Sequence, residues 1–222
     1  LGDLCVRFLL CVICAICGLI LFMGKIIVVV GNSGVGKTTL CAALSAAGAF
    51  TTGLEQHAER PFQALMAADP PRYALANQVD YLLRRAEQER ALRAGALPGL
   101  VDGGLDLDFH AFSRLFHGRG YLSDAEFALC ARLYGTLRGL LGPPDLILRL
   151  TAPLDVVEAR YARRGRPLEI AQRDDLVLME GYITDWLATV HDVPVIAVDA
   201  AANDFCAPAV LASLLGQVQR SF

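Results

Sequence analysis

The stretch from Lys25 to Leu40 constrains the fold of this chain more than any other part of the sequence. It begins with a continuous β-branched run, Ile26–Val30, which predicts a strand buried on both faces. A loop containing three glycines follows, and an Ala- and Leu-rich helix is predicted from about Lys37. Strand, glycine loop and helix in this order form the setting in which a backbone loop binds phosphate.

The loop matches the pattern G-x-x-x-x-G-K-[ST] at every fixed position. Glycine leaves backbone N–H groups free to converge on phosphate oxygens, because no Cβ blocks the approach. Lys37 supplies a cation for the β- and γ-phosphates, and the Thr38 hydroxyl can ligate Mg²⁺. The sequence therefore predicts that ATP and Mg²⁺ are bound by Gly31, Asn32, Ser33, Gly34, Val35, Gly36, Lys37, Thr38 and Thr39.

The length and charge of the chain narrow its class further. Its 222 residues suit one α/β domain with a full core. A formal net charge of −3 provides no general basic surface for nucleic acid, so no nucleic-acid partner is expected. The seven cysteines are either in the N-terminal segment or widely scattered, which suggests no disulfide framework and predicts a reducing, cytoplasmic location.

Strand-like and helical patterns alternate along the rest of the chain. Further strands are predicted at 49–54, 99–102, 145–150 and 193–198, with a long helix over about 71–94 and a shorter one from near Asp106 or Asp108. This alternation predicts a parallel sheet wrapped by helices. The predicted fold class is α/β, a P-loop kinase-like three-layer fold with a five-stranded parallel sheet, helices on both faces and an arginine-rich lid.

Several polar side chains are candidates for phosphoryl transfer. Glu55 follows the second predicted strand, whose carboxyl end faces the ligand crevice of an open α/β sheet, so it is a candidate general base. Gln78 and Arg85 are seven residues apart and therefore project from one side of the long helix. A solvated acid and a solvated helix face are the alternative interpretations.

Four arginines follow the fourth predicted strand, and they can cradle a γ-phosphoryl group as charge develops on it. A basic helix end, favoured by the helix dipole, is the alternative. These arginines are Arg160, Arg163, Arg164 and Arg166.

In their order and spacing these segments resemble the deoxynucleoside kinases, in particular the bacterial deoxyadenosine/deoxyguanosine kinase branch. The resemblance spans roughly residues 24–205. It is carried by GNSGVGKTT, LEQHAERPF, DPPRYALANQVDYLLRR, VDGGLDLD, PPDLILRL and ARYARRGRPLE. It implies an enzyme that transfers the γ-phosphate of ATP to the 5′-hydroxyl of a deoxynucleoside, and it suggests a homodimer.

The resemblance also implies roles for individual residues. Glu55 matches the carboxylate that accepts the 5′-hydroxyl proton, and Gln78 matches the glutamine that hydrogen-bonds the nucleobase edge, a role that its donor and acceptor suit. The remaining matches are Arg85 and Asp108 beside the base, Glu169 at the deoxyribose 3′-hydroxyl, and Arg160, Arg164 and Arg166 as lid arginines. Independently of the resemblance, Asp102, the acid that ends the third predicted strand, is a candidate metal ligand together with Thr38.

Two positions depart from the family pattern. Gly103 stands where the family usually has an arginine near the 5′-hydroxyl, and losing such a cation can cost several kcal/mol of barrier. Arg60 or Arg163 is a candidate to replace it. Ala67 stands where the sugar-binding tyrosine is expected and cannot form that hydrogen bond.

The N-terminal segment is apolar from Phe8 to Met23, about sixteen residues, which is short for a membrane-spanning helix. It leaves no linker between a bilayer and the strand that begins beside Lys25. We therefore predict that residues 1–22 are an extension upstream of a natural start at Met23 and that 23–222 form a single P-loop kinase domain without a membrane partner. A membrane-anchored kinase is the alternative.

Two other functions stay open at this level. A nucleoside monophosphate kinase related to thymidylate kinases would require an arginine pair for the acceptor phosphate, which Gly103 weakens. A nucleotide-binding regulatory protein without transfer activity would follow if the missing cation were essential. The primary prediction is a kinase for a small nucleoside.

Overall fold

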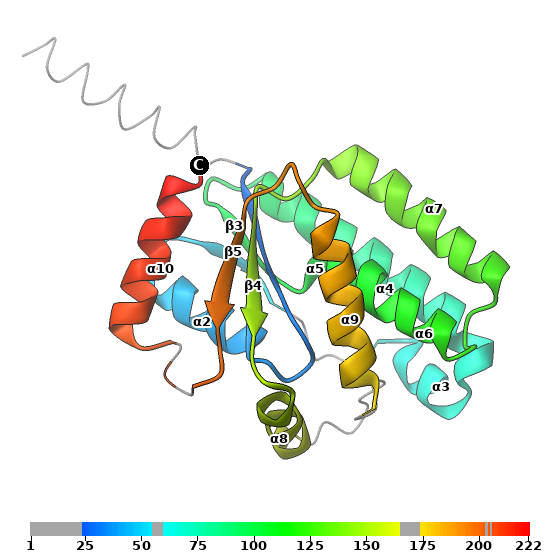
Figure 1. Cartoon of the computed structure of the whole chain (residues 1–222). Helices are drawn as coiled ribbons and strands as arrows, with labels where there is room; N and C mark the ends of the chain where they lie inside the picture. Colours follow the sequence, from blue (N-terminus) through cyan, green and yellow to red (C-terminus); the bar gives the residue numbers. More distant parts are fainter. Residues whose placement is uncertain (1–23, 55–59, 165–173, 203, 205) are drawn as a thin grey trace, which may run out of the picture.

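The computed structural model describes residues 24–54, 60–164, 174–202, 204 and 206–222. Within them, parallel strands form one sheet in the order β2-β3-β1-β4-β5 (Figure 1). The five-stranded parallel sheet predicted from the sequence is confirmed. Its strands are β1 (Ile26–Val30), β2 (Thr51–Gly53), β3 (Gly99–Asp102), β4 (Leu146–Thr151) and β5 (Val195–Asp199).

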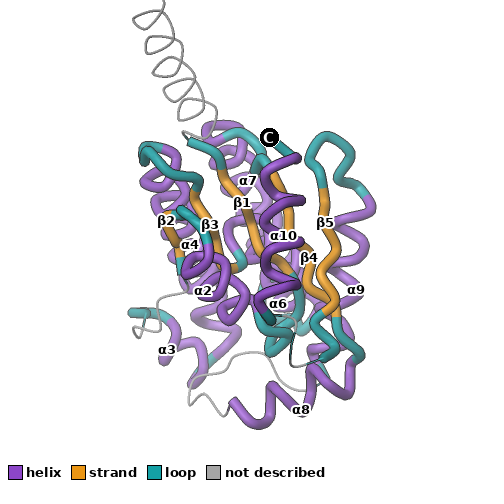
Figure 2. The backbone as a smooth tube through the Cα atoms, turned by 90° about the vertical axis from the view of Figure 1, so that its left-hand side faces the viewer, coloured by secondary structure: helices purple, strands orange, loops and turns teal. Residues whose placement is uncertain are grey.

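Helices cover both faces of this sheet, as the alternating pattern predicts (Figures 1 and 2). None of the helices in the described ranges is both long and apolar enough to cross a membrane. The helices are α2 (Lys37–Ala47), α3 (Gln63–Ala68), α4 (Pro70–Arg93), α5 (Gly104–Leu107), α6 (Arg114–Gly118), α7 (Asp124–Leu141), α8 (Leu154–Arg164), α9 (Asp175–Ala188) and α10 (Pro208–Arg220), with a π-helical turn η1 (Asp108–Ser113) between α5 and α6.

The central strand β1 contributes to two separate cores. Ile26 and Val28 face the layer formed by α4, α5, η1, α6, α7 and α9, whereas Ile27 and Val29 face the layer formed by α2 and α10. Successive side chains of a strand point to opposite faces, and all of these residues are buried because the sheet is covered on both sides. This arrangement explains why the first strand reads as an unbroken apolar run.

The helix predicted from near Asp106 is divided into α5, η1 and α6. In η1 the backbone makes a wider turn, and the Ser113 hydroxyl donates to the Asp108 carbonyl at 3.3 Å. Such π-turns are rare and are often found at functional sites. A π-helical turn holds about one residue more than an α-helical turn. The spacing of apolar residues in the sequence cannot reveal such a turn, because it shifts that spacing by only one position.

A buried polar network joins α4, α5 and α7. Arg138 donates to Asp106 at 2.8 Å and to Glu89 at 2.9 Å, and Tyr134 donates to Asp106 at 2.8 Å. Because the Tyr134 proton points to Asp106, the His110 Nε2, 3.1 Å away, carries a proton and donates to the Tyr134 oxygen. Burial lowers the pKa of His110 to about 4 and raises the pKa of Asp106.

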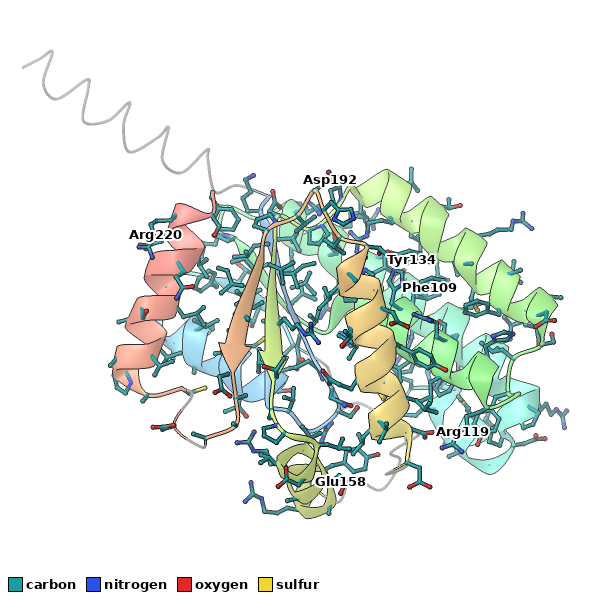
Figure 3. The ribbon with its side chains drawn as sticks, in the orientation of Figure 1. Phe109, Arg119, Tyr134, Glu158, Asp192 and Arg220 are labelled. Atoms are coloured by element: carbon teal, nitrogen blue, oxygen red, sulfur yellow. The ribbon has the colours of Figure 1, made fainter. Side chains whose placement is uncertain are left out.

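Aromatic packing surrounds this network. Phe109 stacks on Tyr134 with ring centroids 4.4 Å apart (Figure 3), and the His110 ring stacks on Trp186 of α9 at 5.0 Å. The aromatic rings shield the imidazole from water, so the folded protein favours the neutral form of His110 over the charged one.

Protonation of His110 should therefore destabilise the fold in mild acid. The unfolded chain, with a His pKa near 6.5, binds more protons than the folded chain between pH 6.5 and 4, so stability falls as the pH drops through this window. We expect His110 to account for a loss of about 1–2 kcal/mol between pH 7 and 5, measured by urea unfolding at both pH values.

The variant His110→Gln removes this titration and should show a smaller pH dependence than the wild type. The matched control is His191→Gln in the exposed loop before β5, which should behave like the wild type. An equal pH dependence in His110→Gln and the wild type would contradict the assignment.

Candidate active site

The phosphate-binding loop lies between β1 and α2. Lys37 extends back along the loop and its Nζ donates to the carbonyl oxygens of Gly31 and Asn32, each at 3.0 Å. Gly34 has a φ of +85°, and a Cβ there would lie 3.2 Å from the backbone of Tyr161 in α8. Glycine is therefore required at this point both by its conformation and by the close approach of α8.

Thr38 and Asp102 meet at the carboxyl edge of the sheet. The Thr38 hydroxyl donates to an Asp102 carboxylate oxygen at 2.5 Å, and Asp102 is only 2% exposed. The two come together because β3 lies beside β1, with Asp102 opposite Val29. A hydroxyl and a carboxylate are the hard oxygen ligands that Mg²⁺ prefers when phosphates and water complete its shell, so these residues fit that ion.

A cavity of about 230 Å³ lies between this loop and α8. Arg160 is anchored at its side, with its guanidinium donating to the Ala200 carbonyl at 2.6 Å and to the Val35 carbonyl at 3.3 Å. In Figure 1 the arrows of β4 and β5 point toward α8, which places α8 at the carboxyl edge of the sheet. The cavity is lined by Gly34, Gly36, Lys37, Thr38, Thr39, Arg160 and Arg164.

A second cluster lies between α4 and η1. Arg85 Nε donates to Asp108 at 2.7 Å, and the Gln78 amide nitrogen donates to Ser113 Oγ at 2.7 Å. All four residues are buried. The predicted placement of Gln78 and Arg85 on one side of α4 is confirmed, because both contact the same π-turn. Ser113 was not singled out in the sequence, where nothing marks the turn that brings it to Gln78.

Gly103 joins the two clusters. It follows Asp102 directly, has a φ of +84°, and a Cβ at this position would lie 3.5 Å from an Arg85 guanidinium nitrogen. The departure from the family pattern is thus more than the loss of a side chain, since this backbone conformation strains any L residue with a Cβ. The Arg85 guanidinium lies beside the point where a side chain at 103 would begin.

The other predicted residues are distributed as follows. Arg60, one of the candidates to replace the missing cation, forms a two-point ion pair with Asp80 of α4 at 2.6 and 2.9 Å. Arg163 and Ala67 are exposed, on α8 and α3 respectively. The segment 1–22 and the predicted site residues Glu55, Arg166 and Glu169 lie outside the described residues.

A glycine phosphate loop at the carboxyl edge of a parallel sheet, with arginines of α8 across a cavity, defines a P-loop nucleotide-binding protein. The sequence model of the deoxynucleoside kinase family matches residues 27–217. The chain therefore belongs to the deoxynucleoside kinase family, whose members are phosphotransferases acting on a nucleoside hydroxyl. The predicted family and enzyme class are confirmed, and the protein is a nucleoside kinase.

Individual relatives agree with this assignment. A deoxyadenosine/deoxycytidine kinase of Bacillus subtilis is 24% identical over 177 residues, covering 78% of this chain and 81% of the relative. A deoxyadenosine kinase of Dictyostelium discoideum is 27% identical over 146 residues, covering 66% of this chain and 59% of that protein.

Solved structures share the fold. The deoxyadenosine kinase of M. mycoides with bound dCTP has a TM-score of 0.71 at 17% identity, covering 89% of this chain and all of that one. The same kinase with dCMP and a flexible dCDP has a TM-score of 0.74 at 19% identity and covers 88% of this chain.

The left-handed conformation of Gly103 predicts a stability cost for any side chain. Gly103→Ala should lower the free energy of unfolding by about 1–2 kcal/mol, because alanine is strained at this φ. The matched control is Gly181→Ala in α9, where no atom lies within 4 Å of the added Cβ and alanine should stabilise the helix by about 0.5–1 kcal/mol. Urea unfolding of both variants measures the difference, and equal effects would show that Gly103 is not strained by a Cβ.

Proposed function

We propose that the protein transfers the γ-phosphate of ATP to the 5′-hydroxyl of a deoxynucleoside. The observation that carries this proposal is the junction at Gly103, where the Thr38–Asp102 pair meets the buried Arg85–Asp108 pair. A donor site and an acceptor site would thus share the carboxyl end of β3. The relatives named for deoxyadenosine and deoxycytidine, and the neighbour with bound dCMP, support a deoxynucleoside acceptor.

On the donor side, the loop amides and Lys37 would hold the triphosphate. Lys37 Nζ now donates to two loop carbonyls, and a phosphate oxygen would offer it a charged acceptor in their place. Thr38 and Asp102 would hold Mg²⁺, which neutralises charge on the β- and γ-phosphates when bound.

Arginines of α8 would complete the donor site. Arg160 and Arg164 line the cavity above the loop, and a guanidinium there stabilises the charge that develops on the transferred group. Arg166 is proposed to act with them. The carbonyl contacts of Arg160 hold it in place, so little conformational entropy is lost when phosphate binds.

On the acceptor side, Glu55 is proposed as the residue that orients the 5′-hydroxyl and accepts its proton. Gln78, Arg85 and Asp108 are proposed to surround the base. Glu169 is proposed to hydrogen-bond the deoxyribose 3′-hydroxyl. A monophosphate acceptor is less well supported, because the Arg85 guanidinium is already directed to the Asp108 carboxylate.

We further propose a cytoplasmic location and a homodimer. The described cysteines, Cys41, Cys130 and Cys206, are free thiols, which suits a reducing compartment. Helix α7 carries Leu129 and Leu140 with 44% and 80% of their surface exposed, and a helix-packed dimer would cover them. Analytical ultracentrifugation of the full chain tests the dimer.

The acceptor assignment is tested by a coupled ATP-consumption assay against the four deoxynucleosides and their monophosphates. We expect turnover with at least one deoxynucleoside, and Glu55→Gln should lower kcat by about 100-fold or more with little change in nucleoside KM. Glu87→Gln, an exposed change on α4, is the matched control and should retain activity.

Two outcomes would redirect the assignment. Turnover only with monophosphates would identify a nucleoside monophosphate kinase. ATP binding without transfer to any acceptor would identify a nucleotide-binding regulatory protein.

The metal assignment predicts a change in Mg²⁺ dependence. Asp102→Asn keeps the size of the side chain but removes its charge, so the Mg²⁺ concentration for half-maximal rate should rise by about tenfold or more. Asp192→Asn is the matched control, because Asp192 lies at the opposite end of the molecule from α8 (Figure 3). An unchanged Mg²⁺ dependence in Asp102→Asn would remove Asp102 from the proposed metal site.

A further inference from the structure

The side chain of Asn32, the second residue of the phosphate loop, is held by α9. It is 1% exposed, and its Nδ2 donates to the Leu176 carbonyl at 2.7 Å and to a Glu180 carboxylate oxygen at 3.3 Å. Its Oδ1 accepts the Ser33 backbone N–H at 2.9 Å. A reversed amide would set its oxygen against two acceptors and its nitrogen against a donor, so these partners fix a single orientation.

The backbone of Asn32 supports the rest of the loop. Its carbonyl oxygen accepts Lys37 Nζ at 3.0 Å and the Val35 N–H at 3.3 Å. Lys37 is the cation proposed to hold the triphosphate. A displacement of Asn32 would therefore move both the loop backbone and the lysine on which the donor site depends.

Glu180 links this residue back to the sheet. Its other carboxylate oxygen accepts from Arg149 Nη2 at 3.3 Å, and the same nitrogen donates to Thr184 Oγ1 at 2.8 Å. Arg149 lies on β4 opposite Val30, the last residue before the loop. A carboxylate beside an anion-binding loop repels phosphate unless a cation compensates it, and Arg149 is that cation. The contacts thus run from β1 through Asn32 and α9 to β4, which pairs with β1 again.

Helix α9 also contacts the proposed acceptor side. Near its carboxyl end, Trp186 stacks on His110 with ring centroids 5.0 Å apart. His110 belongs to η1 and lies two residues after Asp108, which forms the buried pair with Arg85. One helix therefore contacts the phosphate loop through its first two turns and the π-turn through its last turn.

We propose that Asn32 and Glu180 act through their side chains as positioning residues: they fix the phosphate loop to α9 and thereby hold the donor phosphate in line with the acceptor hydroxyl. The inference rests on the proposed function, in which this loop holds the triphosphate and η1 adjoins the acceptor. Transfer requires the attacking oxygen to be aligned with the phosphorus, and a misplacement of about 1 Å can cost about 100-fold in rate. The two side chains act on this alignment.

Exchanging donor and acceptor tests the contact in the full-length protein. Asn32→Asp keeps an oxygen for the Ser33 N–H but turns its second oxygen toward the Leu176 carbonyl and Glu180. At saturating ATP we expect kcat to fall by about tenfold or more, with the nucleoside KM changed by less than about threefold. In the double variant Asn32→Asp/Glu180→Gln, the new amide donates an N–H to the new carboxylate, so kcat should return to within about threefold of the wild type.

A second double variant separates the hydrogen bond from net charge. Asn32→Asp/Asp185→Asn has the same net charge, but Asp185 is an exposed residue of α9 that contacts Arg114 at 3.5 Å. It should stay as slow as Asn32→Asp, and Asp185→Asn alone should match the wild type. Glu180→Ala is a milder variant, because this side chain is 39% exposed, and it should lower kcat by about threefold or more.

Hydrogen exchange measures the same contact without turnover. Because the loop is fixed to α9, saturating ADP should slow amide exchange at residues 176–184 of the wild type by about threefold or more. This protection should be lost in Asn32→Asp and should return in Asn32→Asp/Glu180→Gln. Calorimetry sets the ADP concentration that saturates each variant.

Each outcome decides the inference. Wild-type kcat in Asn32→Asp or in Glu180→Ala would overturn it, as would equal rates in the two double variants. If the wild type phosphorylated no nucleoside, the proposed function would fail, and hydrogen exchange would then decide the inference alone. Protection that is absent from the wild type, or equal in the wild type and Asn32→Asp, would overturn it in that case.

Discussion

The hydrogen bond between Thr38 and Asp102 is the contact around which the site is arranged. It joins the first turn of α2 to the end of β3, two points 64 residues apart in the chain. The parallel pairing of β1 and β3 brings both points together, because the carboxyl ends of parallel strands lie at one edge of the sheet. The phosphate loop leaves β1 at this edge, and β3 continues through Gly103 into the segment that carries the second cluster.

That segment is held from two sides by buried ion pairs. Asp106 forms an ion pair with Arg138 of α7 at 2.8 Å. Two residues later, Asp108 forms an ion pair with Arg85 of α4 at 2.7 Å. Removing one partner of such a pair would leave a buried charge uncompensated, so these arginines and carboxylates depend on one another. The Arg138–Asp106 pair lies in the layer of helices, and the Arg85–Asp108 pair lies in the candidate site. The start of η1 is therefore held in place from both sides.

Much of the fold could be predicted from local patterns. The bounds of β1 and β3 agree with the predicted ones, because both strands are apolar runs bounded by charged or glycine residues. The local patterns do not indicate the short helix α3 or the start of α9 at Asp175. Their limits depend on contacts with distant elements, such as Met66 of α3 in the main core, and these contacts leave no periodic signal.

The sequence by itself determined the phosphate loop, the parallel α/β class and the family, because these depend on residue types at fixed local spacing. Only the tertiary structure decided that Gly103 has a left-handed backbone and that Arg85 lies beside it. It also decided the direction of the Gln78 amide, which Ser113 sets across 35 residues of chain. Side-chain orientation is decided by partners that folding brings close, and a linear pattern of residues does not contain those distances.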